Sequence, residues 1–103
     1  MPITVNLSKS KREGKKYTAI IYENNVKKKT IHFGASRYTD FTRGATSEQR
    51  SQYIQRHKKN EDWGRSGIFS SGFWSRWLLW EKTTLTDAIK NIERKFNIDI
   101  KYK

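Results

Sequence analysis

The stretch Ser71–Lys82 reads SGFWSRWLLWEK and packs three tryptophans, one phenylalanine and two leucines around a single arginine. Such a cluster has three interpretations: a hydrophobic core, a platform for stacking bases, or a docking face. A stacking platform needs rings spread over an open surface, where each stacked base contributes ~1–3 kcal/mol. These rings are crowded, and burying each large side chain contributes ~1.5–3 kcal/mol to a marginally stable domain. We therefore predict that the stretch is mostly core, with one tryptophan left to reach the surface.

The spacing of the apolar residues predicts a helix over residues 73–80. Its apolar side chains would occupy two adjoining faces, with Ser75 and Arg76 on the opposite face. A helix this apolar must be mostly buried, so other elements have to pack against it. The side chains assigned to the core, or to docking with a partner, are the aromatic ones: Phe73, Trp74, Trp77 and Trp80.

Two further helices are predicted on either side of this stretch. Thr46 with Gln49 matches the capping-box pattern, which marks the start of a helix whose apolar stripe is thin. Thr84 with Asp87 offers a second capping box, and apolar residues recur at helical spacing over Leu85–Phe96. The second of these helices has the clearer pattern and is expected to pack on the Trp-rich helix.

The strands are predicted at the two ends of the chain. Ile3–Leu7 and Ile98–Tyr102 alternate apolar and polar residues, as half-buried strands do. Tyr17–Tyr22 and Val26–Phe33 are rich in β-formers and flank Glu23–Asn25, whose asparagines tolerate a tight turn. We predict an α+β fold in which a small antiparallel sheet, made by this hairpin with the terminal strands as candidate additions, packs against two or three helices.

Length and charge narrow the class of protein. A chain of 103 residues is expected to form one small domain, residues 1–103. It has 22 Lys and Arg against 10 Asp and Glu, a formal charge of +12, which favours a polyanionic partner such as DNA or RNA. Cysteine is absent, and no apolar run approaches the ~20 residues of a membrane span. We therefore expect no disulfide and no membrane partner.

Cations gather in three places. Residues 8–16 contain no apolar residue to anchor them and are predicted to form a mobile basic loop. In the second arm of the hairpin, strict alternation would place Lys27 and Lys29 on one face and Lys28 on the other. The run at residues 56–59 has two interpretations of equal weight, a phosphate-binding patch or a solvated helix face. The predicted nucleic-acid contacts are Lys9, Lys11, Arg12, Lys15, Lys16, Lys27, Lys28 and Lys29, with a second patch of Arg50, Arg56, Lys58 and Lys59.

The sequence offers little that indicates catalysis. His32 and His57, with Asp40 and Glu61, are the one set that resembles a metal or acid–base constellation, but their spacing matches no ligand motif. Two histidines in a chain of this size are more often structural or solvent-facing. No glycine belongs to a phosphate-binding loop. We therefore predict a protein that is not an enzyme, with no catalytic residue, metal, cofactor or small-molecule substrate.

Three blocks carry a resemblance to a known family: KTIHFGASRYTDFT (residues 29–42), RSQYIQRHKKNEDW (50–63) and SRWLLWEKTTLTDAIKNIERKF (75–96). In this order they resemble a family of small basic proteins encoded by large DNA viruses of algae and amoebae. The family pattern has Pro-Thr-Leu at the start of the last helix, where this chain has Thr83-Thr84-Leu85; proline there is replaceable. The resemblance implies expression inside an infected host cell, in cytoplasm or nucleus, and incorporation into the virion. It implies no catalytic residues.

Two functions remain open on this basis. The first is a non-enzymatic viral protein that binds nucleic acid through sequence-nonspecific phosphate contacts. The alternative is a virion structural protein, a minor capsid or core component, whose basic surface meets other virion proteins. An exposed apolar surface around Trp74 would favour assembly, whereas a contiguous basic groove would favour nucleic acid.

Overall fold

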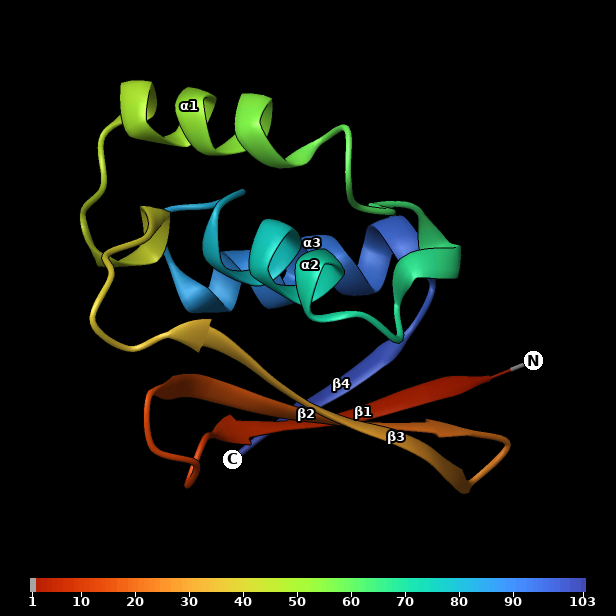
Figure 1. Cartoon of the computed structure of the whole chain (residues 1–103). Helices are drawn as coiled ribbons and strands as arrows, with labels where there is room; N and C mark the ends of the chain where they lie inside the picture. Colours follow the sequence, from red (N-terminus) through yellow and green to blue (C-terminus); the bar gives the residue numbers. More distant parts are fainter. Residues whose placement is uncertain (1) are drawn as a thin grey trace.

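The structure, a computed structural model that describes residues 2–103, has three layers (Figure 1). The strands of the first layer are β1 (Ile3–Lys9), β2 (Lys15–Glu23), β3 (Val26–Ala35) and β4 (Asp99–Tyr102). The helical segments are η1 (Phe41–Arg43), α1 (Ser47–His57), η2 (Arg65–Gly67), α2 (Ser71–Trp74), η3 (Ser75–Leu79) and α3 (Leu85–Phe96). In Figure 1, α2 and α3 cover one face of the sheet, and α1 lies on their far side. The predicted α+β fold, with its Trp-rich helical segment, is confirmed.

The sheet has the strand order β3-β2-β1-β4. The hairpin β2–β3 and the pair β1–β2 are antiparallel, as predicted, and both terminal strands join the sheet. β4, however, is parallel to β1, so the sheet is mixed rather than wholly antiparallel. The difference arises because a tight turn imposes antiparallel pairing only on consecutive strands, whereas β4 reaches β1 through the helical layer.

The predicted turn between β2 and β3 is confirmed, but the faces of β3 differ from strict alternation. Asn24 and Asn25 both adopt positive φ, 53° and 66°, which matches the twist of a two-residue hairpin turn. The pairing then shifts, because Ile21 opposes Lys29 whereas Tyr22 opposes Lys27. The intervening lysine is the extra residue of a β-bulge, so Lys27 and Lys29 lie on opposite faces of the sheet and the prediction of a shared face is wrong.

The predicted basic loop at residues 8–16 is shorter than expected. β1 continues through Lys9 and β2 begins at Lys15, so the connection spans residues 10–14. The N–H of Ser10 donates to the carbonyl of Lys16 at 3.0 Å and closes the base of the connection. The two ends of the connection therefore need no apolar side chains to fix them, because backbone hydrogen bonds and the buried side chain of Lys16 fix them instead.

The core lies between the sheet and the α2–α3 layer. Alternate strand residues, such as Val5, Ile21 and Phe33, point from the sheet into one cluster with the Trp-rich segment. Phe73 and Trp74 are fully buried, which confirms the core interpretation for these two side chains. Trp77 and Trp80 are only partly buried and pack at the edge of the cluster.

The helix predicted over residues 73–80 changes its winding part-way. It begins as α2, with Ser70 accepting from the N–H of Phe73, and continues as the π-helical segment η3. A π-helical turn contains an extra residue, so the faces rotate relative to a regular α-helix. As a result Arg76, expected on the exposed side, is buried at 8% exposure.

The other two helices begin where the caps predict. Thr46 and Gln49 form the reciprocal capping box of α1, and Thr84 accepts from the N–H of Asp87 at the start of α3. Tyr53 of α1 stacks on Trp80 at a centroid distance of 4.6 Å, which attaches the third layer to the second. Within residues 2–103 no helix has the length and apolar character needed to cross a membrane.

Candidate nucleic-acid interface

Most of the predicted phosphate contacts are exposed cations. Lys16 and Arg50 are the two exceptions. In the described part of the chain, none of the exposed cations of the predicted set forms an ion pair with an Asp or Glu. These exposed, unpaired cations are Lys9, Lys11, Arg12, Lys15, Lys27, Lys28, Lys29, Arg56, Lys58 and Lys59.

The structure divides these cations between two sides of the molecule. The cations of residues 9–15 lie where β1 passes into β2, and Lys27–Lys29 lie on β3, an edge strand of the sheet. Arg56 belongs to α1 in the third layer, and Lys58 and Lys59 follow it (Figure 1). The two sets predicted from the sequence are therefore separate patches.

A groove of about 600 Å³ brings part of the first set together beside β3. Its cationic lining comes from three segments: Arg12 between β1 and β2, Lys15 of β2 and Lys29 of β3. Among residues 2–103 no carboxylate lines this groove, which we call the basic groove. The remaining lining residues are Thr30, Ile31, His32, Phe69, Ser70 and Ser71.

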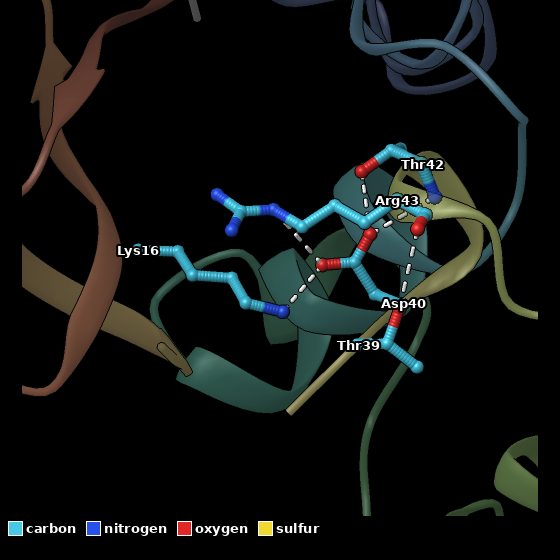
Figure 2. A network of polar contacts seen from close by, with 5 residues as sticks. All are labelled: Lys16, Thr39, Asp40, Thr42 and Arg43. Carbon is cyan, nitrogen blue, oxygen red and sulfur yellow. Dashed lines mark hydrogen bonds and ion pairs between the residues drawn. The ribbon is translucent and has the colours of Figure 1, made fainter. Parts of the chain in front are cut away.

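Lys16 does not belong to this surface, and its prediction as a phosphate contact is wrong. Its side chain is 2% exposed, and its Nζ lies 2.5 Å from Oδ2 of Asp40 (Figure 2). Successive strand side chains point to opposite faces, so the exposed Lys15 is followed by a lysine that points the other way. A run of adjacent cations on a strand therefore cannot all reach one polyanion.

Asp40 is the centre of the polar network in Figure 2. Its other oxygen, Oδ1, accepts from the N–H of Thr42 at 2.9 Å and from the hydroxyl of Thr42 at 2.5 Å. Arg43 approaches Oδ2 at 3.9 Å from the exposed side. Asp40 thus caps η1 and fixes the connection between β3 and α1 to the start of β2.

Arg50 is also occupied within the fold. Its Nε donates to the carbonyl of Trp80 at 2.8 Å, and its Nη2 pairs with Glu81 at 2.5 Å. Arg76 approaches the same carboxylate at 2.8 Å. Burial opposes ionisation of Glu81, but the hydrogen bonds from Arg76 and Arg50 outweigh it and hold the pKa of Glu81 below its ordinary value. Arg50 therefore joins α1 to the second layer and is not a free phosphate contact as predicted.

Arg76 is a buried cation that the sequence pattern missed. Its guanidinium lies 4.4 Å from the ring centre of Trp77 and 5.3 Å from that of Trp63. The aromatic faces and Glu81 together compensate the buried charge. One sequence signal could have indicated its burial: Arg76 is a lone arginine among tryptophans, and tryptophan is the residue on which a cation stacks most favourably.

The aromatic cluster does not form an exposed docking patch. Trp74 is 0% exposed, and its indole N–H donates to the carbonyl of Ile68 at 2.8 Å. Large apolar side chains that are exposed in the described residues, Val26, Tyr38 and Tyr102, belong to separate segments. The apolar surface around Trp74 that would favour assembly is therefore not present in residues 2–103.

A second cleft of about 600 Å³ lies between α1 and the end of β3. It contains His57 and Glu61, whose Nδ1 and Oε2 are 3.3 Å apart, and Trp63 donates to the other oxygen of Glu61 at 3.0 Å. Asp40 is paired with Lys16, and His32 contacts Thr18 instead, so the four residues considered for acid–base or metal chemistry do not meet. No group of three potential metal ligands occurs among residues 2–103.

A comparison with protein-family models places the chain. The model described as "Family of unknown function (DUF5754)" matches residues 5–57. The chain belongs to this family. The stretch of this chain that matches the DUF5754 model runs from β1 through β3 to the end of α1 and includes Lys16, Asp40 and the lysines of β3. No curated protein and no solved structure gives a match to the chain.

Proposed function

We propose that this protein is a non-enzymatic nucleic-acid-binding protein that acts through phosphate contacts without reading the base sequence. The observation that carries the proposal is the set of exposed cations that have no acidic partner within residues 2–103, in a chain of formal charge +12. Unpaired surface cations repel one another, and a phosphate backbone relieves that repulsion while releasing its own counterions. Base-reading is not part of the proposal, because lysines bind phosphates as point charges.

We place this activity in an infected cell and in the virion, as the resemblance to proteins of large DNA viruses implies. Viral DNA or RNA would then be the polyanion. Assembly with other virion proteins is the less favoured function, because the apolar surface around Trp74 that would serve it is buried. Lysines on an edge strand also prevent that edge from pairing with the sheet of another molecule. The test of Lys27–Lys29 on β3 must therefore separate this role from phosphate binding.

The test is fluorescence anisotropy with labelled DNA and RNA over a series of salt concentrations. Affinity is expected to fall steeply with salt and to differ little between base sequences. Replacing Lys27, Lys28 and Lys29 together by Gln should reduce the salt slope by up to about 2.7 for duplex DNA, because each phosphate that a cation neutralises adds about 0.9 to the slope. Light scattering on the same samples would reveal any aggregation through β3.

The matched control removes three cations from outside the predicted set. Lys82, Lys90 and Arg94 are exposed, and replacing them by Gln changes the net charge by the same amount. This variant should keep a salt slope near that of the wild-type protein. Absence of wild-type binding even at low salt would refute the proposed function, and equal losses in both variants would show that net charge alone, rather than the predicted contacts, governs binding.

A further inference from the structure

We infer that the basic groove binds an unpaired strand of nucleic acid, with phosphates on Arg12, Lys15 and Lys29 and a base against Phe69. This inference rests on the proposed function and specifies its site and its preferred ligand. Cations from three segments line the groove, so the fold, and not a run of neighbouring residues, brings them together. The groove, of about 600 Å³, is open to solvent along one side, which suits a strand that lies across it rather than a ligand enclosed within it.

Charge distinguishes the basic groove from the cleft beside α1. The cleft contains the carboxylate of Glu61 beside His57, and its buried lysine, Lys16, is already paired. A phosphate there would meet a like charge, which is unfavourable at short range. The basic groove contains cations without any carboxylate, so a polyanionic backbone is favoured in it.

The other lining residues favour an unpaired strand over a duplex. Phe69 is half-buried, packs on the core with part of its ring and lines the groove. A base in a duplex has both faces covered by its neighbours, so its face can meet an aromatic ring only when the strand is single. The hydroxyls of Thr30 and Ser71 in the lining are small groups that can bond phosphate or base edges, whereas that of Ser70 is engaged with Gly67 and Phe73 at the start of α2.

His32 adds a polar group of fixed orientation to the groove. Its Nδ1 lies 2.8 Å from the hydroxyl of Thr18 on the neighbouring strand. This contact leaves Nε2 as the ring nitrogen that could bond a ligand.

The experiment compares a mixed-sequence single strand with the duplex of the same sequence and length, at matched salt. Charge alone would favour the duplex, because its charge density is higher. We expect instead that the wild-type protein binds the single strand more tightly, by about tenfold. Phe69→Leu keeps an apolar side chain on the core but removes the ring, and it should weaken single-strand binding about tenfold while duplex affinity stays within about twofold.

The charges of the groove are tested against the same control variant as before. Replacing Arg12, Lys15 and Lys29 together by Gln should weaken single-strand binding well beyond the effect of the Lys82, Lys90 and Arg94 replacement. Ultraviolet cross-linking of wild-type protein to oligothymidylate, followed by mass spectrometry, gives a measurement that does not depend on any variant folding. An adduct on Phe69 is the expected result.

The outcomes separate the two proposals. Two results would overturn the inference and leave the proposed function standing. One is wild-type protein that binds the single strand and the duplex with equal affinity, or prefers the duplex. The other is a Phe69→Leu variant whose affinity for the two ligands is unchanged, or falls by the same factor for both. Cross-links confined to segments outside residues 12–15, 29–32 and 66–76 would also overturn it. No binding of either ligand would refute the proposed function itself.

Discussion

The buried pair of Lys16 and Asp40 predicts an asymmetric response to mutation. Asp40→Ala leaves the Lys16 ammonium, on a side chain only 2% exposed, without a counter-charge, and also removes the cap of η1. Breaking a buried ion pair from one side costs ~3–5 kcal/mol, so we expect a loss of that size in the free energy of unfolding. Lys16→Met leaves Asp40 with its two bonds from Thr42 and with Arg43 nearby, so we expect the smaller loss of ~1.5–3 kcal/mol.

Urea denaturation followed by tryptophan fluorescence measures both variants and the double variant. The double variant should be more stable than Asp40→Ala alone, because Lys16→Met then removes an uncompensated buried charge. Nucleic-acid affinity of Lys16→Met should stay close to the wild-type value, since the ammonium does not reach the surface. A loss below about 1 kcal/mol for Asp40→Ala, or a double variant that is less stable than either single one, would refute this reasoning.

Two further predictions concern the Trp-rich layer. Trp74→Ala should lower the free energy of unfolding by ~3–5 kcal/mol, because its ring is fully buried. Trp77→Ala should cost less, because its ring is only partly buried. Similar urea midpoints for the two variants would contradict this prediction. The pKa of Glu81 is lowered from 4.5, so the stability it contributes with Arg76 and Arg50 is present above about pH 4.5 and lost as the pH falls through its folded-state value. Glu81→Gln should therefore be less stable than wild type near neutral pH, and the gap in melting temperature should narrow as the pH falls below about 4.5. A gap that stays constant with pH would contradict the pairing.

Local patterns were sufficient to predict most of the secondary structure. The caps at Thr46 and Thr84 mark helix starts by satisfying backbone donors through neighbours in sequence, and the Asn24–Asn25 turn depends on the two residues themselves. Such features need no knowledge of the rest of the fold. The α+β class follows from them together with the apolar cluster at residues 73–80.

Features set by distant contacts could not be predicted in this way. The parallel pairing of β4 and the bulge that separates Lys27 from Lys29 depend on which strands become neighbours. The role of Lys16 depends on Asp40, 24 residues away, and a lysine in a basic run carries no sign that it is buried. The same limitation applies to the site, because charge alone indicated the exposed lysines but could not show that Arg12, Lys15 and Lys29 line one groove.

The order of the layers has a consequence for how the protein is made. Translation produces β1, β2, β3 and α1 before it produces α2 and α3, yet α2 and α3 form the layer that lies between the early sheet and α1. Until that layer emerges, inward-facing side chains such as Leu7, Ile21 and Phe33 have no partner across the core. A nascent chain therefore carries an apolar sheet face in water, a state prone to aggregation. Like charges repel, so the positive charge of the chain opposes close contact between neighbouring nascent chains during this interval.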